Sequence, residues 1–366
     1  MRAKDQFAGG KAVASCEHLE QRRLFTAALV NQELHRPPRC VADLNGDKCE
    51  DVIVVTNERT GGGGSGGAIG FDTYLNDGKG NMQFVSHTTC KAEAGTVADG
   101  IAVTNIDGGA PDVALKIVTG RATSADPQAA PVVSLILLSG TGKGDFVQRN
   151  TLVIPHVLET RRWSQDPYVE DTQRGCVSGD IDGDQVPDVI SWIESDVVAL
   201  LAKTGKPTPV NVLFNPREYS RVFGVGDMDG DGRADLIAGL DDALCWVPFD
   251  LTAEGSPVAG KIQQVQGVGI TQKTQIVVGD VDGDGITDDL VLMDAQRVTV
   301  GINNLSSGGG IKFAQVDGTL GADPDEVLVG DIDGDGKDEV FVTVDKTKPE
   351  TATKKYYVGH VTLLKQ

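Results

Sequence analysis

The sequence predicts an all-β fold, and within that class a β-propeller of six four-stranded blades, with seven blades as the alternative. Three observations lead to this prediction. A short acidic loop recurs along the chain, each copy runs into a short stretch of β-branched and apolar residues, and no segment has the periodicity of an amphipathic helix. Repeats of this kind indicate a solenoid, a propeller or an array, and short strands separated by turns favour the propeller.

The acidic loop is clearest in the segment GDVDGDGITDD, residues 279–289. Four carboxylates stand at positions one, three, five and nine of the loop: Asp280, Asp282, Asp284 and Asp288. Glycines at positions four and six leave the backbone free to curl, so that these side chains can face one point. Such a concentration of negative charge is unfavourable without a cation, and oxygen-only ligands favour calcium.

The same pattern recurs in four other loops, which supply the remaining predicted ligands. In chain order these are Asp43, Asn45, Asp47, Asp51, Asp180, Asp182, Asp184, Asp188, Asp227, Asp229, Asp231, Asp235, Asp331, Asp333, Asp335 and Glu339. We therefore predict about five structural Ca²⁺ ions. A sixth loop, TNIDGGAPD, is one residue short and offers Asn105, Asp107 and Asp112, so its occupancy stays open.

Each loop is expected to lie within a unit of four antiparallel strands. The strands that follow the loops are predicted at residues 51–55, 112–118, 188–193, 235–240, 289–293 and 339–344. A second strand follows at residues 71–77, 133–140, 197–203, 243–250 and 297–304. A turn and a third strand come next, and a final strand such as QIVVGD or EVLVGD leads into the following loop.

The last unit is one strand short, because only KKYYVGHVTLLKQ follows residues 339–344. The segment RLFTAALVNQ, residues 23–32, precedes the first loop and has no unit of its own. We expect this N-terminal strand to complete the last blade and close the ring, since an open sheet edge would otherwise remain. The predicted organisation is an N-terminal targeting or disordered segment, residues 1–22, followed by the propeller, residues 23–366.

The composition of the 366-residue chain agrees with a folded, cation-binding protein. Hydrophobic residues make up 40% of the chain, which is enough for a core, and 46 glycines suit a chain with many tight turns. The net charge of −20 argues against a nucleic-acid partner, whose phosphates need a basic surface. Much of this charge lies at the predicted ligand positions, so it indicates cation sites rather than a surface for a basic partner.

The cysteines and the apolar segments point to no further class of site. Six cysteines are scattered without CxxC pairs or zinc-ligand spacing, and we expect most of them to be buried free thiols. No apolar run reaches the roughly 18 residues that a membrane-spanning helix needs, so no transmembrane segment is expected.

Two other types of loop site are excluded. An EF-hand requires a bidentate Glu at position twelve. Here that position falls inside the following strand and is occupied by Val54, Ser191, Ala238, Val291 and Val342. The glycine-rich stretches 61–67 and 140–145 lack the Lys followed by Ser or Thr that a phosphate-binding P-loop requires, and they lie between strands.

The segment RVFGVGDMDGDGRADLIAGL, residues 221–240, resembles the FG-GAP repeat of VCBS-like and integrin-α-type β-propellers. The likeness includes Phe223-Gly224 before the loop and Ala238-Gly239 after it, and it implies structural calcium at positions one, three, five and nine. The segment CEHLEQRRLFTAAL, residues 16–29, resembles the LEPR-type N-terminal motif of exported planctomycete proteins. These resemblances imply an extracellular or cell-surface protein.

The resemblance to FG-GAP propellers implies a binding or adhesion module for an unidentified protein or glycan, and we expect a monomer. The best candidate for a ligand site is the insertion TRRWSQDPYVED, in which Arg161, Arg162, Trp163 and Tyr168 have the composition of a binding hot spot. The alternative is that Trp163 packs this insertion onto the propeller. A structural cell-envelope domain and a carbohydrate-active enzyme on the same fold are the alternative functions. Because the five histidines show neither paired spacing nor a catalytic motif, we predict no catalytic residues and no enzyme.

Overall fold

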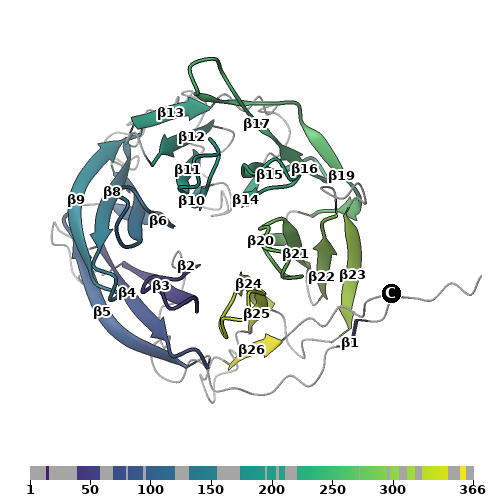
Figure 1. Cartoon of the computed structure of the whole chain (residues 1–366), viewed down its shortest axis with the longest axis horizontal. Helices are drawn as coiled ribbons and strands as arrows, with labels where there is room; N and C mark the ends of the chain where they lie inside the picture. Colours follow the sequence, from purple (N-terminus) through teal and green to yellow (C-terminus); the bar gives the residue numbers. More distant parts are fainter. Residues whose placement is uncertain are drawn as a thin grey trace, which may run out of the picture.

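The structure, a computed structural model, describes residues 14–15, 39–57, 69–79, 81–93, 96–119, 132–154, 174–193, 196–202, 206–210, 221–271, 273–294, 297–304, 311–317, 324–344 and 355–359. Within these residues every regular element is a β-strand. Figure 1 shows the strands arranged as small sheets around a central axis, which is the architecture of a β-propeller.

The first three sheets are each built from four consecutive strands. Sheet 1 contains β2 (Arg39–Ala42), β3 (Asp51–Asn57), β4 (Ile69–Asn76) and β5 (Met82–Cys90). Sheet 2 contains β6 (Val97–Thr104), β7 (Asp112–Thr119), β8 (Val132–Gly140) and β9 (Phe146–Val153). Sheet 3 contains β10 (Arg174–Gly179), β11 (Asp188–Ile193), β12 (Asp196–Leu201) and β13 (Lys206–Val210).

The other three sheets vary this plan. Sheet 4 contains β14 (Arg221–Gly226), β15 (Asp235–Leu240), β16 (Ala243–Val247) and β19 (Gln263–Gly269), with the separate ribbon β17 (Phe249–Leu251) and β18 (Pro257–Ala259) inserted between the last two. Sheet 5 contains β20 (Gln275–Gly279), β21 (Asp289–Asp294), β22 (Arg297–Ile302) and β23 (Lys312–Asp317), and the two-residue strand β1 (Ala14–Ser15) pairs with it. Sheet 6 contains β24 (Pro324–Gly330), β25 (Glu339–Val344) and β26 (Lys355–Gly359).

Strands that follow one another within a sheet pair antiparallel, beginning with an innermost strand near the axis. In Figure 1 the innermost strands are β2, β6, β10, β14, β20 and β24, whereas β5, β9 and β23 lie at the rim. The middle strands are covered on both faces by the neighbouring sheets. In β7, for example, all residues from Asp112 to Val118 are buried. This double burial explains why the middle strands are continuous apolar runs rather than alternating ones.

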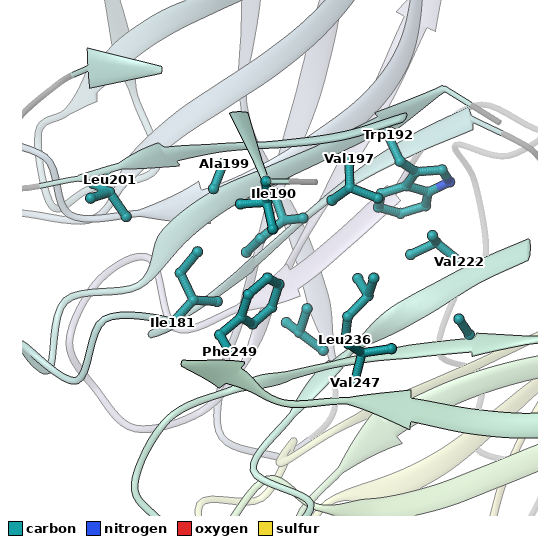
Figure 2. Close-up of a cluster of buried hydrophobic side chains, with 13 residues drawn as sticks. Ile181, Ile190, Trp192, Val197, Ala199, Leu201, Val222, Leu236, Val247 and Phe249 are labelled. Atoms are coloured by element: carbon teal, nitrogen blue, oxygen red, sulfur yellow. The ribbon is translucent and has the colours of Figure 1, made fainter. Parts of the chain in front are cut away.

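The hydrophobic core is a series of layers between adjacent sheets. Figure 2 shows the layer between sheets 3 and 4, in which Ile190, Trp192 and Val197 from sheet 3 face Leu236 and Val247 from sheet 4. Trp192 is a core residue of this layer, since its side chain is 5% exposed. Among the described residues, such clusters lie between sheets 1 and 2, 2 and 3, 3 and 4, 4 and 5, and 5 and 6, so apolar contacts hold most neighbouring sheets together.

The predicted number of four-stranded blades was wrong. Five sheets have four or more strands, whereas sheet 6 has three strands among the described residues. The strand predicted to complete the last blade, residues 23–32, lies outside the described residues. The N-terminal strand that the structure does describe, β1, pairs in parallel with β23 of sheet 5. Periodicity indicates that a strand exists, but any open edge within reach of the chain can accept it, so sequence could not assign this pairing.

Candidate metal centre

Six acidic loops join the innermost strand of each sheet to the next strand outward. We number them by sheet as loop 1 (43–51), loop 2 (105–112), loop 3 (180–188), loop 4 (227–235), loop 5 (280–289) and loop 6 (331–339). Because the same connection recurs around the ring, the loops lie on one face of the propeller. Backbone hydrogen bonds join neighbouring loops across several boundaries between sheets.

An apolar residue at position two anchors each complete loop to the core. These residues are all buried: Leu44, Ile181, Met228, Val281 and Ile332. Ile181 belongs to the cluster between sheets 3 and 4 and lies beside Phe249 in Figure 2. Burying an aliphatic side chain of this size contributes about 1.5–3 kcal/mol. The loops are therefore fixed to the sheets by apolar contacts that do not depend on a cation.

The carboxylate at position one wraps the loop around itself. In loop 5, Asp280 Oδ1 accepts hydrogen bonds from the N–H of Gly283 at 2.8 Å and of Asp284 at 3.0 Å, and Oδ2 accepts one from Gly285 at 2.8 Å. Loops 3, 4 and 6 repeat these three contacts, and loop 1 repeats the first and third. Positions three and five each accept one further N–H, from the residue two places on. The acidic side chains thus build the loop as well as line it.

Two positions in each complete loop have a left-handed backbone. Position four is glycine in all five loops, with φ between 76° and 80°. Position six is glycine in loops 4, 5 and 6, but it is Lys48 with φ 72° in loop 1 and Gln185 with φ 66° in loop 3. A residue with a Cβ in this conformation costs about 1–2 kcal/mol. Loops 1 and 3 therefore carry a backbone strain energy that loops 4, 5 and 6, with glycine at position six, avoid.

The acidic side chains converge in four of the loops. One ligand atom from each of three acids lies within 4.8 Å of the others in the groups Asp180, Asp182, Asp184; Asp227, Asp229, Asp235; Asp280, Asp282, Asp284; and Asp331, Asp333, Glu339. In loop 1, Asn45 Nδ2 instead donates to Asp47 Oδ2 at 3.0 Å. All donors in the four groups are carboxylate oxygens, so these residues fit a hard divalent cation such as calcium.

The position-nine acid begins the second strand of its sheet and is almost fully buried. Its side chain accepts the N–H of position two at 2.9 to 3.1 Å in loops 1, 3, 4 and 6. Burial raises the pKa of Asp188 and Glu339 to about 7 and that of Asp235 to about 8, and the charge of Asp229 contributes to the shift at Asp235. Because burial disfavours the charged form, these groups are stabilised either by a proton or by a nearby cation.

Loop 5 is one residue longer than the others, and this changes its position-nine residue. Asp289 begins β21, in agreement with the strand predicted at residues 289–293, whereas Asp288 was predicted as the position-nine ligand. Asp289 accepts hydrogen bonds from Val281 N and Asn303 N, both at 2.9 Å, as position nine does elsewhere. Asp288 is also buried, and burial together with the charge of Asp289 raises its pKa to about 8. The spacing of the acids could not show this shift because both neighbours are Asp; a ligand role for Asp288 stays a prediction.

Loop 2 keeps the framework of the other loops without their cluster of acids. Asp112 accepts the N–H of Ile106 at 2.8 Å, as a position-nine acid does. At position one, however, Asn105 Nδ2 donates to Gly109 O at 3.2 Å, and Asp107 Oδ1 accepts from Gly109 N at 3.0 Å. Loop 2 is not among the groups of converging acids found in the described residues.

Sequence reasoning missed two buried asparagines that connect loops of adjacent sheets. Asn76 N donates to Asp51 in loop 1 at 2.8 Å, while its Nδ2 donates to Ile332 O in loop 6 at 2.7 Å. Asn303 likewise donates from N to Asp289 in loop 5 and from Nδ2 to Met228 O in loop 4, both at 2.9 Å. The signal in the sequence is an Asn at or just after the end of the second strand that follows the acidic loop, in YLND for β4 and in GINN for β22.

The remaining predictions fall partly outside the described residues. The candidate ligand-binding residues Arg161, Arg162, Trp163 and Tyr168 lie there, as does the segment that resembles an export motif. The five cysteines that the structure describes are free, and four of them are buried, as expected. In the described part of the chain no helix is long and apolar enough to cross a membrane.

Comparison with known proteins identifies the repeat. Residues 180–238, which contain loops 3 and 4, match the FG-GAP-like repeat family. The sequence matches no curated protein. The fold is similar to TcdB2-TccC3 (TM-score 0.45, 13% identity), over 97% of this chain but only 16% of that one.

Two further solved structures are similar at the same level. They are a putative 6-phosphogluconolactonase from Bacteroides uniformis (TM-score 0.43, 14% identity, 84% of this chain and 82% of that one) and the hemagglutinin-neuraminidase ectodomain of parainfluenza virus 5 (TM-score 0.44, 12% identity, 97% and 89%). The matched repeat holds two of the acidic loops, and the sheets around it form a ring, so the chain is a β-propeller that contains an FG-GAP-like repeat at residues 180–238.

Proposed function

We propose that the protein is a calcium-stabilised β-propeller that acts outside the cell as a binding module. The observation that supports calcium is the convergence of three acids within 4.8 Å in each of four loops. Positions one, three, five and nine would hold the ion, with Asp289 or Asp288 completing loop 5. Bound calcium would supply the positive charge that makes ionisation of these buried carboxylates favourable.

The proposed role of the ion is structural. A ligand that binds the native state and not the unfolded chain stabilises the fold by mass action. Calcium modules of extracellular proteins have dissociation constants on the order of 10⁻⁴ to 10⁻³ M, which suits an environment where calcium is abundant. The FG-GAP-like repeat supports the proposed extracellular or cell-surface location, where sites of this affinity would be filled.

Removal of calcium tests the structural role. We expect EGTA to lower the melting temperature of the calcium-loaded protein by several degrees, and excess calcium to restore it. Asp284→Asn removes a carboxylate from the converging group of loop 5 and should reduce the rise in melting temperature that calcium causes. Asp107→Asn in loop 2, which lacks such a group, is the matched control and should leave that rise unchanged. Equal melting temperatures in EGTA and in calcium would show that the loops hold no stabilising ion.

The binding function is proposed for the insertion at residues 160–171. The support is its content of Arg, Trp and Tyr, which are enriched in binding hot spots. A glycan array and a pull-down of cell-surface proteins, each with and without calcium, would identify a ligand. Trp163→Ala should abolish that binding at an unchanged melting temperature. A lower melting temperature instead would show that Trp163 packs the insertion, and failure to capture any ligand would favour a structural cell-envelope domain.

A further inference from the structure

Neighbouring acidic loops are joined by backbone hydrogen bonds that follow a rule of position. The N–H of position eight in one loop donates to the carbonyl of position one in the loop of the preceding sheet. Ala234 donates to Asp180 O at 2.6 Å, Asp338 to Asp280 O at 2.8 Å, and Glu50 to Asp331 O at 2.7 Å. The last of these joins loop 6 to loop 1 and so connects the end of the chain to its beginning.

The connection between loops 4 and 5 follows a variant of this rule. The extra residue in loop 5 reverses the direction of the bond, and Asp227 N donates to Thr287 O at 3.0 Å. Position one of loop 4 is still tied to the residue before Asp288. Asn303 adds a second connection across the same boundary through Met228 O.

Side chains at position seven make a further contact across these boundaries. Lys337 of loop 6 lies over Gly283 of loop 5, and its Nζ donates to Asp282 O at 3.1 Å. Arg233 of loop 4 lies over Gly183 of loop 3, and Cys49 of loop 1 lies over Gly334 of loop 6. In each pair the glycine is the left-handed position four of a loop whose carboxylates converge.

The geometry of one peptide group connects two cation sites. Position seven contributes the C=O and position eight the N–H of a single planar, trans peptide. Because the two groups point in opposite directions, the N–H faces the neighbouring loop while the C=O of the same peptide points away from that loop. Hydrogen bonds in series polarise one another. A change in the backbone of one loop is therefore transmitted to the residue that provides the first carboxylate of the loop in the preceding sheet.

Two prolines end this chain of contacts. The residue before the last acid of the loop is Pro111 in loop 2 and Pro187, at position eight, in loop 3, and proline has no N–H to donate. The boundary between loops 2 and 3 is instead bridged by the hydroxyl of Thr104, which donates to Pro187 O. The backbone connections thus run through loops 3, 4, 5 and 6, whose acids converge, and continue to loop 1, whereas they exclude loop 2.

We propose that loops 3, 4, 5, 6 and 1 bind calcium cooperatively, as one array bounded by Pro111 and Pro187. This inference rests on the proposed calcium function and adds the coupling between sites. A loop that has bound calcium orders the peptide group that holds position one of the neighbouring loop. The neighbouring loop then loses less conformational entropy when it binds its own calcium ion. Typical couplings between sites change affinity by about 5-fold or more.

The test measures the calcium midpoint of each loop separately. Hydrogen–deuterium exchange with mass spectrometry on the full chain would follow peptides from loops 1, 3, 4, 5 and 6 across a calcium titration. In the wild type we expect one shared midpoint and a Hill coefficient above one. Independent midpoints would overturn the coupling while leaving calcium binding intact. If no loop responds to calcium, the proposed function itself fails.

The matched variant is Ala234→Pro, which removes one donor at the boundary between loops 3 and 4. Pro187 shows that a loop of this length accepts proline at the same position. We expect loop 3 to acquire its own, weaker midpoint, shifted about 5-fold or more, while loops 4, 5, 6 and 1 stay coupled. Ala234→Ser keeps the N–H and should match the wild type. A shared midpoint for loops 3 and 4 in Ala234→Pro would overturn the proposal.

A second variant keeps the proposal testable if Ala234→Pro does not fold. Asp335→Asn removes a position-five carboxylate from loop 6, in an exposed part of the loop. If the sites are coupled, loops 5 and 1, which adjoin loop 6, should need a higher calcium concentration to become protected from hydrogen exchange. Asp107→Asn in loop 2 is the control and should change no other loop. Unchanged midpoints in loops 5 and 1 would contradict the coupling.

Discussion

Asn303 shows how a single residue joins two sheets. Its backbone N–H and its side chain donate to loops 5 and 4 respectively, and only 3% of its surface is exposed. Asn76 makes the equivalent pair of contacts across the boundary between the last and first sheets, where its surface is 4% exposed. At the residue scale, two boundaries between sheets are therefore bridged by a buried asparagine whose side chain donates to a backbone carbonyl of the neighbouring loop.

Replacement of Asn303 by alanine should destabilise the protein. The substitution leaves Met228 O buried without its side-chain donor, and an unsatisfied buried polar group costs about 1–3 kcal/mol. Urea unfolding in EGTA would measure the loss, so that calcium does not contribute. Asn150→Ala is the control, because Asn150 is exposed on β9 and its side chain accepts only locally, from Thr151 N. A surface change of this kind should stay within about 0.5 kcal/mol.

The glycine that precedes an acidic loop makes room for the neighbouring loop. A Cβ at Gly279 would meet the carboxylate of Asp338, and one at Gly226 would lie 2.6 Å from Thr287 O. Gly226→Ala should therefore lower the free energy of unfolding by about 1–3 kcal/mol through overpacking. Gly269→Ala is the comparison, since its Cβ would lie 3.8 Å from Asp242 O, an ordinary contact. Equal stability of the two variants would contradict the close approach of the loops.

At the scale of the element, one extra residue in loop 5 changes which acid closes the loop. Asp289 accepts three N–H groups, from Val281, Asp282 and Asn303. Asp288 precedes the strand and lies among the charges of Asp289, Asp284 and Asp282. The two adjacent acids therefore have separate roles that a spacing pattern cannot distinguish.

Substitution of the two acids should separate folding from calcium binding. Asp289→Asn should lower stability in EGTA by about 1–3 kcal/mol, because an amide presents one acceptor oxygen where three N–H groups converge. Asp288→Asn should change stability in EGTA little at pH 7, since a carboxyl with a pKa near 8 is already neutral there. If Asp288 is a ligand, Asp288→Asn should also reduce the stabilisation by calcium. Urea unfolding with and without calcium measures both effects.

At the scale of the whole molecule, the ring collects carboxyl groups whose pKa values burial has raised. They include Asp51 at about 6, Asp188 and Glu339 at about 7, and Asp235 at about 8. A carboxyl with a raised pKa in the folded state stabilises the fold below its unfolded pKa, and this stabilisation is lost as the pH rises through the folded value. The metal-free propeller is therefore least stable at neutral to alkaline pH.

The pH dependence of stability should reverse when calcium is present. In EGTA, the melting temperature should rise as the pH is lowered from 8 to 5, because the buried carboxyls take up protons in the folded state. In saturating calcium it should fall over the same range, since protons compete with the ion for the ligands. Thermal unfolding in both buffers at each pH gives the two slopes. If the melting temperature changed with pH in the same direction in both buffers, protons and calcium would not be competing for these carboxyls.

Much of the candidate site could be predicted because it lies within short stretches of sequence. The acids of loop 4 stand two residues apart, and the turn that brings Asp227 and Asp229 together is built by hydrogen bonds inside the loop. The contacts of Asn76 with Ile332 could not be predicted, because they join residues from opposite ends of the chain. The same holds for β1, whose pairing with β23 depends on which sheet edge the N-terminal chain reaches.

The sequence by itself determined the strands, the turns, the five complete acidic loops and the propeller class, because these follow from local periodicity and from side chains a few residues apart. Only the tertiary structure decided the strand count of sheet 6, the role of Asp289 and the hydrogen bonds between loops. The reason is physical: these features arise where one sheet meets another. A repeat in the sequence specifies each unit, whereas the contacts between units depend on how the ring closes.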